Sequence, residues 1–381
     1  MHDRQVLLDQ TRQMLALHAA GTTTMVDDIG IEPVSAYLDP ERWERERELL
    51  FRRRPSIIGL SCELTGPGAY TTLDIAGVPV VVVRQDGGGI RAFVNACRHR
   101  GAQVVDGDGC SRRLTCPYHG WTYDTAGALV GVPTAGAFAE LDRTVHGLVE
   151  LPAAERHGLM FVTATPGEPI DLDALLGPVA AELTELGLDA LHFTECRRLE
   201  AACNWKLAMD TNCESYHFGA LHRNSIGPFT MNDLNVTLPL GRSMRVTFAA
   251  VSLPTLADRP EAEWRPEDHL QFVYLLFPNC SLLITGDHVE LFRIFPGDRP
   301  DRSVTLQSYY SRTPVVTETD QMMATAQFDM FHGVVRDEDY PCAETIQATL
   351  ATGANTHLTF GRNEPALQHL HRGFDEELEA G

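Results

Sequence analysis

Residues 97–121 read CRHRGAQVVDGDGCSRRLTCPYHGW and contain two short segments of the same kind. Each segment supplies one cysteine and one histidine, Cys97 with His99 and Cys116 with His119. Two thiolates and two imidazoles on a pair of loops can enclose a [2Fe–2S] cluster, with the cysteines on one iron and the histidines on the other. Because two neutral imidazoles replace two thiolates, such a cluster has a higher reduction potential than an all-cysteine cluster.

A structural zinc site of two cysteines and two histidines is the alternative use of these residue types. Zinc knuckles usually carry their cysteines as a close pair, whereas here each segment carries one, and this spacing favours the cluster. Gly101 and Gly120 follow the two segments and predict tight loops, because glycine adopts backbone conformations that other residues avoid.

The paired motif resembles that of the Rieske iron–sulfur proteins, which it also matches at Arg98, Gly101, Pro117, Tyr118, Gly120 and Trp121. A Rieske domain alone would be an electron carrier, which is one interpretation of this chain. A long stretch of sequence follows the motif, however, and it contains a second group of residues with metal-binding chemistry.

The second group lies in residues 204–222, which read NWKLAMDTNCESYHFGALH. His217 and His222 are five residues apart, so on an ideal helix they would point about 140° away from each other. Both can reach one metal ion only if the helix bends or ends between them, and Gly219 is a natural place for this. Glu214 lies three residues before His217, so on a helix the two side chains would share one face.

This stretch is similar to the catalytic-iron signature of Rieske oxygenase large subunits. The resemblance implies that His217 and His222 bind a mononuclear ferrous iron. It also implies a distant aspartate ligand, and the matching acidic segment is 336–344, where Asp339 is our assignment and Asp337 and Glu338 are the alternatives. The three ligands would form a 2-His-1-carboxylate triad with open positions for O₂ and substrate.

The resemblance also assigns roles to two further carboxylates. Glu214 would bridge to a cluster histidine of the next subunit, His99 or His119, in a cyclic homotrimer. Asp210 would hydrogen-bond a ligand histidine and hold its tautomer, or else be an ordinary surface carboxylate.

The strand and helix patterns predict an α+β fold. Residues 1–55 are expected to be a helical segment packing on the catalytic domain, residues 56–166 a small all-β Rieske domain, and residues 167–381 the catalytic iron domain. The last domain should hold an antiparallel sheet flanked by helices, of the helix-grip or START-like type. Expected features are helical residues 171–187, short-linked strands at 243–251, 270–277, 281–285, 289–295 and 304–310, and a long helix over 317–350.

These expectations make the chain the terminal component of a Rieske-type non-haem iron oxygenase, which hydroxylates a small organic, aromatic substrate by mono- or dioxygenation. The alternative within this enzyme class is oxidative demethylation of a quaternary amine such as a betaine. The sequence has no flavin or nicotinamide fingerprint, so NAD(P)H would act through a separate ferredoxin or flavin reductase.

Composition excludes some partners. The 381 residues carry a net charge of −21, which disfavours nucleic acid and anionic membranes as partners because both would repel the chain. No segment approaches the ~20 apolar residues of a membrane span, and the N-terminal residues lack the apolar core of a signal peptide. The nine cysteines follow no disulfide framework, which predicts a cytoplasmic protein.

Overall fold

The computed structural model describes residues 4–381, which fall into two compact units. One unit is Arg47–Leu176, and the other joins the N-terminal residues up to Glu46 with Gly177–Gly381. The division therefore differs from the expected boundaries at 55 and 166. The π-helix Arg47–Arg52 belongs to the smaller unit because Arg47 and Arg52 both donate hydrogen bonds to the carbonyl oxygen of Ala76, each at 2.8 Å.

The smaller unit is built from three antiparallel sheets, with strand orders β10-β5-β4-β3-β6, β11-β12-β2 and β7-β8-β9. Its strands are β2 (Ser56–Leu60), β3 (Ala69–Ile75), β4 (Val78–Arg84), β5 (Ile90–Val94), β6 (Gly109–Cys110), β7 (Arg113–Thr115), β8 (Thr122–Asp124), β9 (Leu129–Gly131), β10 (Glu150–Leu151), β11 (Ala153–Arg156) and β12 (Leu159–Val162). One short helix, α4 (Leu172–Leu176), ends the unit. The expected small β domain is thus confirmed.

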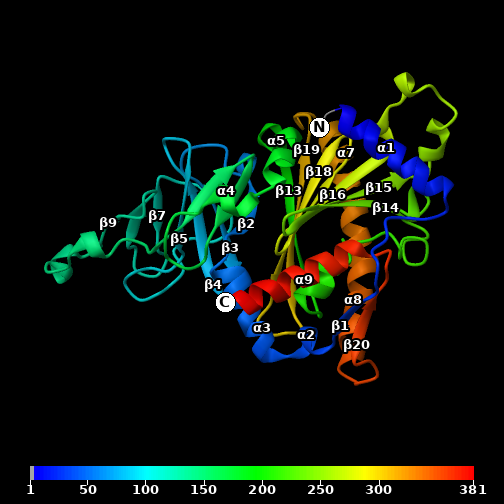
Figure 1. The fold of residues 1–381 in the computed structure, drawn as a ribbon. Helices are drawn as coiled ribbons and strands as arrows, with labels where there is room; N and C mark the ends of the chain where they lie inside the picture. The colour runs from blue at the N-terminus through cyan, green and yellow to red at the C-terminus, as the bar shows by residue number, and fades with distance from the viewer. Residues whose placement is uncertain (1–3) are drawn as a thin grey trace. The chain divides into compact units, whose positions relative to one another are not determined.

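The larger unit is organised by a seven-stranded antiparallel sheet with the order β13-β19-β18-β17-β16-β15-β14. Its strands are β13 (His192–Ala201), β14 (Thr230–Leu240), β15 (Ser243–Ala250), β16 (Leu270–Leu276), β17 (Cys280–Ile284), β18 (His288–Pro296) and β19 (Ser303–Ser311). Every residue of β18 is buried, so both faces of the central sheet are covered. In Figure 1 the C-terminal helix α9 (Pro365–Ala380), drawn in red, crosses in front of these strands.

The remaining helices of the larger unit are α1 (Arg4–Ala19), α2 (Ser35–Leu38), α3 (Pro40–Glu46), α5 (Val179–Leu186), α6 (Trp205–Asp210), α7 (Glu318–Val334) and α8 (Tyr340–Leu350). None of the helices described is long and apolar enough to cross a bilayer. This sheet with flanking helices confirms the α+β prediction.

Two helical predictions in the first half of the chain need correction. The N-terminal segment is not helical throughout, because Gly30–Pro33 form a strand, β1, which pairs with β20 (His357–Phe360). The single helix expected over 171–187 is two helices, since Gly177 has a positive φ and Pro178 cannot donate the next helical hydrogen bond.

The helix expected over 317–350 is interrupted by a π-helical turn, Val335–Asp339, between α7 and α8. Pro341 therefore lies in the first turn of α8, where its missing N–H leaves no hydrogen bond unmade. This turn sets the direction of Asp339, and π-helical turns of this kind are frequent at functional sites.

Candidate cluster and metal centre

The four residues of the paired motif lie on two loops of the smaller unit, one after β5 and one between β7 and β8. The loops have the same backbone pattern. Gly101 N–H donates to the carbonyl oxygen of Cys97 at 2.8 Å, and Gly120 N–H donates to that of Cys116 at 3.0 Å. Both glycines have positive φ, +78° and +70°, which satisfies the prediction of tight loops.

The loops bring the two thiols and the two imidazoles together. Cys97 and Cys116 are buried in one core cluster, and burial, followed by the neighbouring Cys97, raises the pKa of the Cys116 thiol. The ring centroids of His99 and His119 are 4.6 Å apart. His99 Nδ1 is buried and has no hydrogen-bond partner. Two adjacent thiols and an orphaned imidazole nitrogen are what an iron–sulfur cluster would engage.

The surroundings of the loops hold these side chains in place. The ring of His99 stacks on Trp121 at 4.9 Å, and Tyr123 Oη lies 3.4 Å from Cys97 Sγ while it accepts the backbone N–H of Arg98 at 2.9 Å. His119 is exposed and His99 is half-buried, so His119 is the more accessible of the two imidazoles.

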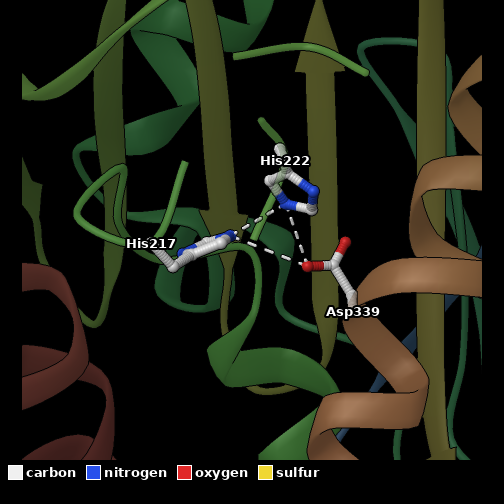
Figure 2. Close-up of side chains that lie close together, drawn as sticks. All are labelled: His217, His222 and Asp339. Carbon is white, nitrogen blue, oxygen red and sulfur yellow. Dashed lines mark hydrogen bonds and ion pairs between the residues drawn. The ribbon is translucent and has the colours of Figure 1, made fainter. Parts of the chain in front are cut away.

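His217, His222 and Asp339 converge in the larger unit, as Figure 2 shows. His222 Nε2 lies 3.0 Å from His217 Nε2 and 3.1 Å from Asp339 Oδ1, and His217 Nε2 lies 3.6 Å from the same oxygen. Ligand atoms at right angles around one metal, at about 2.1 Å from it, lie roughly 3 Å apart. The three atoms therefore have the separation of a facial triad.

The second nitrogen of each ring is held by a carboxylate. Glu214 Oε1 hydrogen-bonds His217 Nδ1, and Glu338 Oε2 hydrogen-bonds His222 Nδ1 at 2.6 Å. With the proton on Nδ1, each Nε2 presents a lone pair to the shared centre. Asp339 Oδ1, which faces the same centre, is buried and makes no hydrogen bond of normal geometry. Three acceptor atoms facing one another fit a cation between them.

The electrostatics of this centre agree with that arrangement. Burial raises the pKa of Asp339, and the neighbouring His222 offsets the rise only in part. Burial lowers the pKa of His222, but Asp339 and Glu338 outweigh this effect, and the net shift of the pKa is upward.

Of the three candidate carboxylates, only Asp339 reaches the centre. Glu338 lies behind His222, and Asp337 is exposed and paired with Arg336.

The local backbone differs from the expected bent helix. Helix α6 ends at Asp210, and residues 211–229 form turns. Side chains accept two of the backbone N–H groups: Glu214 Oε2 accepts from His217 N–H at 3.1 Å, and Asn232 Oδ1 accepts from Gly219 N–H at 2.6 Å. Only a short helix-like stretch remains, in which Leu221 N–H donates to the carbonyl oxygen of His217 at 2.8 Å. Glu214 and His217 thus meet through a turn and not on a helix face.

A cavity of about 100 Å³ opens beside the triad, between the sheet and the π-helical turn. Four phenylalanines and five aliphatic residues dominate its wall: Phe218, Phe248, Phe292, Phe331, Ile226, Val273, Leu283, Val334 and Val335. Among the residues described, no lysine or arginine lines it. The remaining lining residues are Glu214, His222 and Asp339 together with Thr211, Asn212, Gln271 and Ser281.

Two protein-family models match the chain, one in each of its two units. Residues 188–380 match the family described as the ring hydroxylating alpha subunit (catalytic domain), and residues 55–147 match the Rieske [2Fe-2S] domain. The chain belongs to the Rieske oxygenase alpha-subunit family. Its smaller unit is accordingly the Rieske domain and its larger unit the catalytic domain.

Named relatives fall into two groups. The chlorobenzene dioxygenase subunit alpha of Cupriavidus sp. (strain PS12) is 34% identical over 67% of this chain and 56% of the relative. The glycine betaine monooxygenase oxygenase subunit of Chromohalobacter salexigens is 31% identical over 50% of this chain and 42% of the relative. The chain therefore spans about half the length of the curated relatives it matches.

Solved structures share the fold at low sequence identity. A quaternary ammonium Rieske monooxygenase in complex with L-carnitine has a TM-score of 0.77 at 20% identity, covering 91% of this chain and 96% of the other. Naphthalene 1,2-dioxygenase from Rhodococcus sp. bound to indole has a TM-score of 0.72 at 20% identity, covering 99% of each chain.

Asp210 of the catalytic domain does not take the expected place beside a ligand histidine. Its carboxylate bonds to His371 Nε2 at 2.8 Å and accepts from Tyr37 Oη at 3.1 Å. The end of α6 directs Asp210 toward α9 and α2, while Glu214 and Glu338 hold the ligand rings.

Two partners were not predicted from the sequence. Glu338 was missed as a histidine partner, although its position next to Asp339 was a usable signal. His371 was missed because nothing in the sequence connects it to residue 210.

His371 makes a pH-dependent contribution to stability. Burial lowers its pKa, but the charges of Asp210 and of Glu32, 3.7 Å away, raise it to about 9. A histidine pKa that is raised on folding stabilises the folded state fully below ~6.5, and the stabilisation is lost as pH rises through 9. We expect the difference in unfolding free energy between wild type and His371→Gln to shrink by up to about 3 kcal/mol from pH 6.5 to 9.5.

Urea unfolding at the two pH values measures this difference. His369→Gln is a matched control in the same helix, because burial lowers the pKa of His369 and it titrates below this range. An unchanged difference between wild type and His371→Gln would contradict the raised pKa.

Proposed function

We propose that this chain is the terminal oxygenase component that inserts oxygen from O₂ into a small, uncharged, aromatic compound. Cys97, His99, Cys116 and His119 would hold the cluster, and His217, His222 and Asp339 the catalytic ferrous iron. The observation that carries the proposal is the convergence of two histidine nitrogens and one buried carboxylate oxygen beside an apolar cavity. When bound, the iron supplies open coordination positions for O₂, and the cluster supplies an electron.

The residues of this chain have separate tasks in that reaction. Glu214 and Glu338 keep the protons of His217 and His222 on Nδ1, so that each Nε2 stays available. The phenylalanines of the cavity exclude water and orient the substrate ring next to the triad.

The cavity favours an uncharged ring as the substrate. Its volume, about 100 Å³, is of the same order as that of the roughly 150 Å³ apolar cavities that bind benzene. Two relatives are named for chlorobenzene and benzene. Either small ring would bury its apolar surface against the phenylalanines.

Oxidative demethylation of a quaternary amine is the second candidate. Four phenylalanines could hold an ammonium group through cation–π contacts. The carboxylate of a betaine, however, would face Glu214 and Asp339 with no lysine or arginine among the described lining residues. Unpaired like charges in a buried site are costly, which favours the aromatic substrate.

Electron supply completes the proposal. The relatives are named alpha or oxygenase subunits, which supports a multicomponent system with a separate ferredoxin or flavin reductase. The cytoplasmic location stays a prediction. A homotrimer would bring the cluster of one subunit to the iron of the next, with Glu214 as the bridge. His119 is the better cluster-side partner because it is exposed, whereas His99 is half-buried against Trp121.

Electron paramagnetic resonance of the reduced, iron-replete protein under nitric oxide tests the proposed function. We expect a high-spin ferrous–nitrosyl signal beside that of the reduced cluster, and perturbation of the nitrosyl signal by toluene but not by glycine betaine. A cluster signal alone would leave an electron carrier. Perturbation by betaine alone would support demethylation instead.

Glu338 offers a separate prediction about iron affinity. Glu338→Gln removes the charge that supports the His222 Nδ1 proton and should weaken iron binding about 10- to 100-fold, as such partners typically do. Titration of the iron-free protein with ferrous ion measures the effect. Asp337→Asn, at the neighbouring exposed position, should bind iron like wild type, and equal affinities of the two variants would count against the role of Glu338.

A further inference from the structure

One buried hydroxyl in the wall of the cavity has no hydrogen-bond partner. Ser281 lies in β17 at the floor of the cavity, its side chain is fully buried, and its Oγ contacts no donor or acceptor. Leu275 of β16 and Phe292 of β18 are its cross-strand neighbours, and their side chains offer no polar group. A buried hydroxyl without a partner destabilises a protein, so an apolar residue would be expected here.

Strand alternation places this hydroxyl on the cavity side. Ser281 shares its face of β17 with Leu283, which also lines the cavity. The residues of the other face, such as Ile284, line a different hollow of the sheet. Ser281 therefore lies on the face of β17 that lines the cavity, with a buried hydroxyl whose hydrogen-bonding capacity is unused.

The other uncharged polar residues of the cavity are differently placed. Thr211 donates to the carbonyl oxygen of Ala208 at 3.0 Å, and Asn212 donates to the same oxygen at 3.4 Å. Gln271 is half-exposed, so water can satisfy its amide. Among the described uncharged residues of the wall, Ser281 is thus the buried one whose side chain has no hydrogen-bond partner.

We propose that Ser281 is the specificity contact for an uncharged hydrogen-bonding substituent on the substrate ring, such as a hydroxyl or an amino group. This inference rests on the proposed function and narrows its substrate class from uncharged aromatic compounds to those that carry a polar substituent. An anionic substituent does not fit, because Glu214 and Asp339 line the same cavity without a lysine or arginine. A quaternary ammonium group does not fit either, because it offers Ser281 neither a donor nor an acceptor.

Binding of phenol and toluene to the holoenzyme and to Ser281→Ala tests the proposal. The two ligands have nearly the same size and differ by a hydroxyl in place of a methyl group. By isothermal titration calorimetry, we expect the Kd of phenol to rise about tenfold in Ser281→Ala, the loss of one buried hydrogen bond. The Kd of toluene should stay the same or fall. Equal changes for both ligands, no change for either, or no binding of phenol to the wild type would overturn the proposal.

Ser308→Ala is the matched control in the same sheet. Ser308 is also fully buried, but its hydroxyl accepts a hydrogen bond from Arg293 at 2.7 Å. We expect Ser308→Ala to lower the melting temperature and to leave the ratio of the two Kd values unchanged. Ser281→Ala should keep or raise the melting temperature, and a clear decrease would indicate a structural role for Ser281.

The calorimetric readout separates this inference from the proposed function. A missing ferrous–nitrosyl signal would remove the oxygenase proposal, yet a phenol-selective loss in Ser281→Ala would still establish the polar contact. A normal nitrosyl signal with equal losses for phenol and toluene would retain the oxygenase and reject Ser281 as the specificity residue.

Discussion

Replacing Asp339 by alanine should abolish oxygenation while leaving the Rieske cluster intact. Asp339 supplies the carboxylate atom nearest to His222 Nε2, at 3.1 Å, and its loss leaves two imidazoles to hold the ion. Substituting a residue that only hydrogen-bonds a metal ligand already lowers metal affinity or activity by up to about 100-fold. The loss of a ligand itself should therefore lower iron affinity and turnover by at least that factor. The cluster residues belong to the other unit and should keep their full complement of iron.

Three measurements together check this result: iron per chain, the spectrum of the reduced cluster, and substrate turnover. The expected variant has lost the mononuclear iron and its nitrosyl signal but shows the cluster spectrum of the wild type. Asp337→Ala is the neighbouring control, because Asp337 is exposed and pairs with Arg336. Wild-type iron content in Asp339→Ala would reject Asp339 as a ligand.

The second large effect concerns a buried ion pair that joins α3 to α6. Lys206 Nζ lies 2.8 and 2.7 Å from the two carboxylate oxygens of Glu46, and both side chains are fully buried. Trp205 Nε1 donates to Glu46 at 2.9 Å, and Arg42 lies 3.0 Å from it. Burial lowers the pKa of Lys206, and Glu46 opposes this shift. The lysine charge therefore depends on its partner.

Glu46→Leu should lower the free energy of unfolding by about 3–5 kcal/mol, because it leaves a buried ammonium group without a counter-charge. Adding Lys206→Met to Glu46→Leu should restore part of the loss, since the double variant no longer buries that charge. Denaturant unfolding of the two single variants and the double variant gives the coupling free energy directly. Glu41→Leu, on the exposed face of the same helix, is the control for loss of a carboxylate. Strictly additive effects would show that the two charges do not stabilise each other.

The sequence alone determined those loops and strands whose conformation depends on residues close together in the chain. The cysteine and histidine spacing of 97–119 predicted the cluster loops, and alternating hydrophobicity predicted the strands β15–β19 within one or two residues. The triad residues were also named from spacing and resemblance, because His217 and His222 lie close together in the chain. Local patterns of this kind reflect backbone geometry, which short stretches of sequence encode.

Packing also decided which side of the strands forms the cavity wall. Phe248, Leu283 and Phe292 line the cavity. Phe272 points to the other side of β16, because successive strand residues face opposite ways and its neighbours Gln271 and Val273 take the cavity side. The residue composition of a segment identifies it as a strand, but it does not identify which face of that strand lines the cavity.

Only the tertiary structure decided which carboxylate hydrogen-bonds which histidine. Glu338 supports His222 across 116 residues, and Asp210 pairs with His371 across 161, and neither pairing leaves a local mark in the sequence. Residues 211–229 form turns, in which Glu214 and the distant Asn232 accept hydrogen bonds from the backbone N–H groups of His217 and Gly219. Contacts between residues far apart in the chain depend on how sheet and helices pack, and a periodicity read along the sequence carries no record of that packing.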